Sequence, residues 1–124
     1  MSEAFEPDYR FLKKYRLKLK NDFAKVYEHG LVASDATLVI HALRNELAFT
    51  RIGLSVGKRV GIAPIRNRWK RWMREAYRLR RIELPIGIDV VIRPRRGAEG
   101  SYLAIEKSML KLFRELDRRL PQRL

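Results

Sequence analysis

One segment limits what this chain can fold into. From Ile65 to Arg81, strong positive charge and large apolar side chains share about four turns of a potential helix. At about 100° per residue, one side of that helix is apolar and the other is basic. The apolar side carries Ile65, Trp69, Trp72, Met73, Ala76 and Leu79, and the basic side carries Arg66, Asn67, Lys70, Arg71, Arg74, Arg78 and Arg81. This separation predicts an amphipathic helix whose apolar face is covered by the rest of the chain.

The positive charge of this helix destabilises it in isolation and indicates an anionic partner. Arg66 to Arg81 contains eight basic residues and one acid, Glu75, and each like-charged i, i+4 pair costs a few tenths of a kcal/mol. Burial of the apolar face outweighs that cost, so we expect core packing for Trp69 and Trp72, while Tyr77 at the boundary fits either environment. Arginine predominates over lysine, and its planar fork suits phosphate, whereas a merely soluble face mixes both signs.

The whole chain repeats the charge bias of the helix. Its 124 residues carry a net charge of +14, which favours a polyanionic partner: nucleic acid first, an anionic membrane surface second. The length suits one domain. We expect residues 1–20 to form a tail and basic arm, partly flexible, and residues 21–124 to form the domain. The arm is either solvated or in contact with RNA.

Several classes of protein are excluded or disfavoured. The chain has no cysteine, so disulfides, thiolate metal sites and thiol nucleophiles are excluded. No apolar run reaches the length of a membrane span, and the first residues do not resemble a signal peptide, so we expect a cytoplasmic protein. His29 and His41 lie on different predicted elements and have no obvious carboxylate partner, and Asp89 is isolated in a strand, so we expect no catalytic residue in this chain.

Periodicity and turn residues place the remaining elements. We expect a helix over Asn21–His29 ending at Gly30, and a helix over Tyr102–Leu120 ending at Pro121. Pro64 suits the first turn of the basic helix. Thr37–Leu43 and Leu47–Val56 are predicted to be two antiparallel strands, and Gly87–Arg93, apolar on both faces, a central strand.

Particular motifs resemble the protein component of bacterial ribonuclease P. They are Ile52-Gly53-Leu54-Ser55-Val56-Gly57-Lys58-Arg59, Arg66-Asn67-Arg68, Lys70-Arg71, Arg74-Glu75-Ala76 and, upstream, Asp22 to Gly30. The resemblance covers about 100 of the 124 residues. It implies a single small α/β domain, an α+β two-layer sandwich of order αβββαβα. Its mixed sheet would contain a left-handed βαβ crossover, although right-handed crossovers are the rule.

The resemblance also implies two binding surfaces. The residues that would contact the catalytic RNA are Lys58, Arg59, Arg66, Asn67, Arg68, Lys70, Arg71 and Arg74. Those that would bind the single-stranded 5′ leader of precursor tRNA are Phe23, Tyr27, Val39 and His41. The spacing agrees, because residues i and i+4 share a helix face and residues i and i+2 share a strand face. Without the resemblance, Phe23 and Tyr27 fit an ordinary core as well.

The implied activity belongs to a complex. In the family an RNA subunit with Mg²⁺ cuts the phosphodiester, and the protein improves substrate and metal binding. We therefore expect the partners to be the catalytic RNA and precursor tRNA, with no membrane or small-molecule substrate, and protein ligands to Mg²⁺ are unknown. Two alternatives stay open: a noncatalytic RNA binder such as a ribosomal protein, and a membrane-surface helix at Ile65–Arg81.

Overall fold

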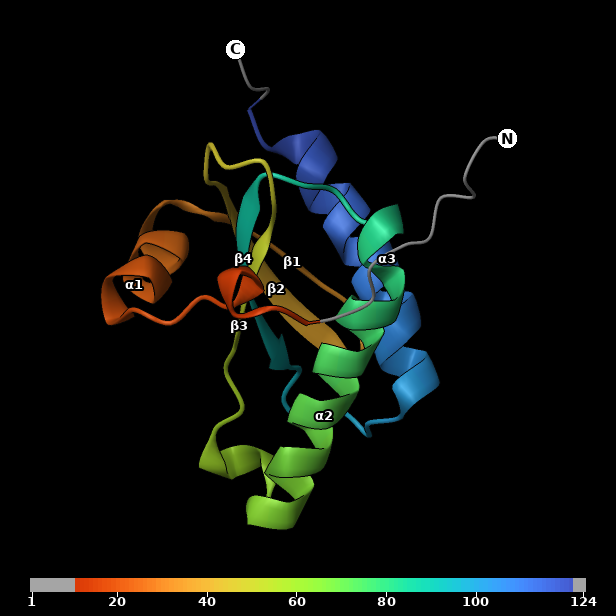
Figure 1. The fold of residues 1–124 in the computed structure, drawn as a ribbon. Coiled ribbons are helices and arrows are strands. Elements are labelled where there is room, and N and C mark those ends of the chain that lie inside the picture. Colours follow the sequence, from red (N-terminus) through yellow and green to blue (C-terminus); the bar gives the residue numbers. More distant parts are fainter. Residues whose placement is uncertain (1–10, 122–124) are drawn as a thin grey trace.

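The computed structural model describes residues 11–121, which fold into a four-stranded sheet with helices on both faces (Figure 1). The main elements are α1 (Lys20–His29), β1 (Leu31–Ser34), β2 (Leu38–Arg44), β3 (Arg51–Leu54), α2 (Ala63–Arg80), β4 (Ile88–Pro94) and α3 (Tyr102–Arg119). Three short 3-10 turns are η1 (Lys13–Tyr15), η2 (Lys58–Val60) and η3 (Arg81–Glu83). The order αβββαβα is confirmed.

The sheet has the strand order β1-β2-β4-β3, and β4 lies in the middle as its apolar sequence predicts. β2 pairs with β4 in antiparallel fashion and β3 pairs with it in parallel. The sheet is therefore mixed. The connection β3-α2-β4 joins two adjacent parallel strands, and in Figure 1 it has the left-handed sense that the resemblance implies.

The two strands predicted at 37–43 and 47–56 are antiparallel as expected, but they are not neighbours in the sheet. β2 and β3 run in opposite directions, but β4 separates them, and only Arg51–Leu54 of the second range is a strand. Asn45 explains the difference, because its Oδ1 accepts from the backbone N–H of Leu47 and its own N–H donates to the carbonyl of Gly87. These bonds direct the chain past the start of β4, so that β3 lies on the opposite side of β4 from β2.

The two faces of the sheet are covered unequally. The main core lies between the sheet and the pair α2 and α3, with Ile40, Val90, Met73, Leu112 and Phe113 inaccessible to solvent. The other face carries α1 and a small cluster of Leu17, Val26 and Val91. α1 is short and covers part of its face, so a strip of the sheet beside it, including Val32 opposite His41, stays exposed.

Most of the predicted apolar face of α2 is buried. Trp69, Met73 and Ala76 are in the core, Trp72 packs partly against it, and Tyr77 is buried as well. Ile65 and Leu79 are 37% exposed, which corrects their assignment to the core face. Because this face already covers a sheet, it does not serve as a membrane-inserting surface. No helix within residues 11–121 is long and apolar enough to cross a membrane.

Residues 1–10 of the expected N-terminal tail lie outside the described residues. Part of the arm that follows packs on the domain: Arg16 forms a parallel bridge with Ile52, and the N–H of Leu17 donates to the carbonyl of Ile52. The ring of Phe11 meets Tyr77 edge to face at 5.7 Å between centroids. The arm therefore covers the free edge of β3.

Candidate nucleic-acid interface

Phe23 lies where α1 crosses the sheet, and a missing side chain on β3 makes room for it. A Cβ on Gly53 would stand 2.4 Å from the ring carbon Cζ of Phe23, closer than real contacts allow. Glycine at position 53 thus lets the tip of the ring approach the backbone of the strand. Phe23 is half-buried, so part of its ring faces solvent beside the open strip of the sheet.

One turn along α1, Tyr27 meets His41 of β2. Their rings are 4.8 Å apart and nearly perpendicular, and Tyr27 is 43% exposed. Burial lowers the pKa of His41 below its usual 6.5, and the nearby charge of Arg93 lowers the pKa further, so the imidazole is neutral at pH 7. Its Nε2 is buried and has no hydrogen-bond partner among the described residues. Tyr27 and His41 thus present an aromatic, uncharged surface.

Val39 is on the same face of β2 as His41 but offers little surface, since it is 9% exposed. It lies opposite Arg93 of β4. Phe23 and Tyr27 thus lie one turn apart on α1, against Gly53 of β3 and His41 of β2, and we call the surface of Phe23, Tyr27 and His41 the aromatic cleft. Val39 forms part of the floor beneath it.

An ion network that sequence reasoning missed holds α1 above this cleft. Asp89 is 7% exposed, and its Oδ1 accepts from Arg51 Nε at 2.9 Å and from Asn45 Nδ2 at 2.8 Å. Arg51 also lies 3.7 Å from Asp22 at the start of α1. The hydrogen bond to Asp89 raises the pKa of Arg51. Asp89 is therefore not isolated, and the parallel register of Arg51 opposite Asp89 could have been found only once the strand order was known.

The basic residues assigned to the catalytic RNA lie on α2 and on the loop before it. Six are exposed: Lys58, Arg59, Asn67, Arg68, Arg71 and Arg74. Arg66 and Lys70 are half-buried, and Arg66 Nε is buried without a partner among the described residues. Within residues 11–121 none of the basic members of the set forms an ion pair, although Arg68 lies over the ring of Trp72 at 6.0 Å.

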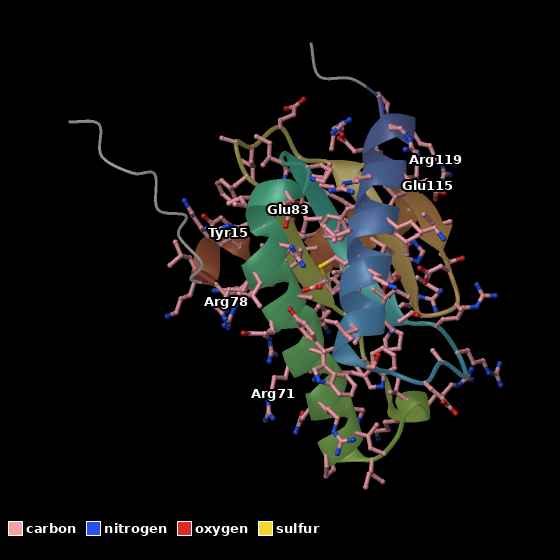
Figure 2. The ribbon with its side chains drawn as sticks, turned by 90° about the vertical axis from the view of Figure 1, so that its right-hand side faces the viewer. Tyr15, Arg71, Arg78, Glu83, Glu115 and Arg119 are labelled. Atoms are coloured by element: carbon pink, nitrogen blue, oxygen red, sulfur yellow. The ribbon has the colours of Figure 1, made fainter. Side chains whose placement is uncertain are left out.

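The C-terminal half of α2 is different, because acids hold its arginines. Arg78 Nε donates to Glu75 Oε2 at 3.1 Å, and Arg80 donates to Glu83 at 3.0 Å and to Glu106 of α3 at 3.1 Å. The bond to Arg78 lowers the pKa of Glu75, and the bond to Arg80 lowers the pKa of Glu106. Figure 2 shows α2 and α3 side by side in front of the sheet, with Arg71 and Arg78 labelled on α2.

The two predicted surfaces are continuous. A hollow of about 190 Å³ between α1, β3 and α2 is lined by Phe23 and Gly53 on one side and by Lys70 and Arg74 on the other. A strand of nucleic acid lying in the aromatic cleft would therefore pass directly onto the cationic half of α2. Such a surface offers stacking for unpaired bases and cations for their phosphates.

Comparison with known proteins gives one consistent result. A sequence model of the family described as Ribonuclease P matches residues 11–117. The ribonuclease P protein component of Clostridioides difficile is 40% identical over 103 residues, which cover 82% of this chain and 90% of that protein. The solved ribonuclease P protein of Thermotoga maritima superposes with a TM-score of 0.75 at 28% identity, covering 81% of this chain and 96% of that one. The corresponding Staphylococcus aureus structure gives 0.73 and 28%, covering 82% and 94%.

Proposed function

Since the chain belongs to the ribonuclease P protein family, whose members are the protein component of that ribonucleoprotein, we propose that it binds two RNAs through two adjoining surfaces. The cationic half of α2, with Lys58 and Arg59 before it, binds the catalytic RNA. The aromatic cleft of Phe23, Tyr27 and His41 binds the single-stranded 5′ leader of precursor tRNA. The cytoplasmic location expected from the sequence is part of the same proposal.

The observation that carries the proposal is the junction of these surfaces. The hollow lined by Phe23, Lys70 and Arg74 connects them without an intervening acid. Cations without acidic partners within residues 11–121 can neutralise phosphates of two RNAs that would otherwise repel each other. Each base stacked on an aromatic ring adds about 1 to 3 kcal/mol. The protein thus favours the bound complex while the RNA carries the chemistry.

Mg²⁺ enters the proposal through the RNA subunit. Residues 11–121 contain no group of three or more His, Cys, Asp or Glu side chains placed to hold a metal ion. The buried carboxylate of Asp89 is already occupied by Arg51 and Asn45. These residues do not fit a protein cage for Mg²⁺, so in our proposal the ion that stabilises the reacting oxygens is bound by RNA.

Reconstitution with a bacterial catalytic RNA tests the proposal. We expect the protein to increase cleavage of precursor tRNA at low Mg²⁺. We expect Tyr27→Ala to weaken binding of leader-bearing precursor by about tenfold, the loss of one stacked base, and to leave mature tRNA almost unchanged. Leu103→Ala is the matched control, because Leu103 is an exposed apolar residue on α3, away from the cleft.

Two outcomes would contradict the proposal. If the protein does not stimulate cleavage at any salt concentration, its role in the ribonucleoprotein is not the one described here. If Tyr27→Ala weakens precursor and mature tRNA equally, the cleft does not distinguish a leader, and a general RNA-binding role, as in the ribosomal-protein alternative, is favoured.

A further inference from the structure

A second and larger hollow lies near the start of α2, where Trp69 lines it. It measures about 560 Å³ and lies between the segment 55–60, which follows β3, and the segment 93–98, which comprises the end of β4 and the loop after it. We call it the loop cavity. It shares no lining residue with the hollow between α1 and α2. Lys58 and Arg59 in its lining also belong to the surface assigned to the catalytic RNA, but Arg93, Arg95 and Arg96 belong to neither surface described above.

The walls of the loop cavity are strongly cationic. Five basic residues line it, and no acid does: Lys58, Arg59, Arg93, Arg95 and Arg96. Arg95 is partly engaged, since its Nη1 donates to Ser34 Oγ and to the carbonyl of Asp35, both at 3.3 Å. The other four form no ion pair within residues 11–121. Cations from two loops facing one space repel each other, and an anion between them removes that repulsion.

The residues at the floor and the rim of the loop cavity indicate which kind of chemical group is attached to the bound anion. Trp69 forms part of the lining although it is 4% exposed, and it is fixed by Gly100, where a Cβ would lie 2.6 Å from Trp69 Cζ2. Gly57 and Gly97 lie at the rim, and a Cβ on either would meet nothing within 4 Å. The site thus combines an apolar floor with cationic walls and an open mouth.

The size of the cavity selects among nucleic-acid ligands. Its volume is within the roughly 300 to 1,000 Å³ of cavities that hold small organic molecules. A duplex is too wide to enter it, whereas a single unpaired nucleotide can place its base toward the floor and its phosphate toward the arginines. Arginine pairs with phosphate through two parallel hydrogen bonds, so two arginines can hold one phosphate from both sides.

We propose that the loop cavity binds one unpaired nucleotide of RNA, with its phosphate held by Arg93 and Arg96 and with Lys58 closing the opposite wall. This rests on the proposed function and adds a third RNA contact to it. The nucleotide belongs either to the precursor leader, whose path over His41 leads to Arg93, or to the catalytic RNA beside Lys58. The chemistry is the same for both sources.

Binding of the two RNAs to charge variants tests the site and distinguishes its source. The variant R93Q/R96Q removes two phosphate contacts, and R114Q/R118Q, exposed on α3, removes the same charge elsewhere. We expect R93Q/R96Q to weaken one RNA by about tenfold more than the control does, and to reduce the salt slope by about 0.7, because the two arginines hold one phosphate. A loss with catalytic RNA alone identifies that RNA. A loss only with leader-bearing precursor, compared with leaderless tRNA in the holoenzyme, identifies the leader.

A steric variant separates the cavity from its charge. Gly57→Leu places a side chain at the rim, at an ordinary backbone φ of −81°, and leaves the net charge unchanged. We expect it to weaken the same RNA as R93Q/R96Q does, and it decides the question if the double variant fails to fold. The proposal is overturned if Gly57→Leu binds both RNAs like wild type, or if a folded R93Q/R96Q variant matches R114Q/R118Q. If Tyr27→Ala still weakens leader binding in that case, only the loop cavity is rejected and the proposed function stands.

Discussion

Both halves of α2 are rich in basic residues, but only the C-terminal half has acids that pair with its arginines. Within residues 11–121, the arginines and lysine from Arg66 to Arg74 have no acidic partner, whereas Arg78 and Arg80 are held by Glu75, Glu83 and Glu106. The C-terminal half with Arg78 and Arg80, which we call the held half, fastens α2 to α3 and to the turn that follows α2. The unpartnered half has the cations that can exchange their counterions for RNA phosphates. Charge counted along the sequence therefore overstates the surface available to RNA.

The strongest test of this comparison neutralises the unpartnered half. We expect the triple variant R68Q/R71Q/R74Q to lose about a thousandfold in affinity for the catalytic RNA, at about tenfold for each of three lost charge-assisted contacts. Its salt slope should fall by about 2 to 3, because three counterions fewer are released. All three side chains are exposed, so the melting temperature should stay close to wild type.

The held half supplies the matched control for that experiment. R78Q/R80Q removes two positive charges from the same helix, and we expect only a few-fold loss of RNA affinity together with a drop in melting temperature. Filter binding at several salt concentrations and thermal unfolding measure both quantities. Equal losses of affinity per charge from the two halves would show that α2 acts as one uniform cationic rod, contrary to the comparison.

Arg51 extends the comparison to an arginine held inside the fold. Arg51→Met leaves the buried carboxylate of Asp89 without its charged partner, and we expect a loss of about 2 kcal/mol in the free energy of unfolding. Because Arg51 also contacts Asp22 of α1, discrimination between precursor and mature tRNA should weaken as well. Urea unfolding and binding of both tRNAs give the two readouts. Unchanged stability would mean that Asp89 is satisfied without Arg51.

The smallest expected effect comes from releasing a held arginine. Glu75→Gln removes the acid beside Arg78, so affinity for the catalytic RNA should rise about two- to threefold at pH 7, with a salt slope steeper by at most about 0.9. The folded pKa of Glu75 lies below its usual 4.5, so its ion pair contributes stability above that pH and loses it as the pH falls through the lowered value. Wild type and Glu75→Gln should therefore converge in stability at strongly acid pH. A lower affinity for Glu75→Gln at pH 7 would contradict the interpretation.

Short-range sequence patterns predicted the structural features that depend on residues close together in the sequence. The amphipathic period gave the bounds of α2 to within two residues at its start, and the double-sided apolar run placed β4 in the centre. The acids that hold Arg80 could not be predicted in this way, since Glu106 is 26 residues away and reaches Arg80 only after α3 has packed on α2. The same reason hid the pairing of Arg51 with Asp89, which depends on a strand inserted between β2 and β3.

For the candidate sites as well, sequence spacing predicted some features and tertiary packing determined the others. Phe23 and Tyr27 share a helix face and Val39 and His41 a strand face, so each pair follows from spacing. That Phe23 rests on Gly53, and that Val39 is nearly buried while His41 is not, depends on the angle at which α1 crosses the sheet. The loop cavity has no local sequence signal at all, because its walls come from segments more than 30 residues apart.

The free edges of the two outer strands, β1 and β3, form hydrogen bonds with other parts of the same chain. Arg16 and Leu17 bond to the rim of β3, and Arg119 Nη1 donates to the carbonyl of Val32 on β1 at 2.9 Å. While the protein is free, mutual repulsion at +14 keeps its copies apart. Once RNA cancels that repulsion, an unprotected rim would invite strand-to-strand assembly into aggregates, and these contacts block it when electrostatics no longer can.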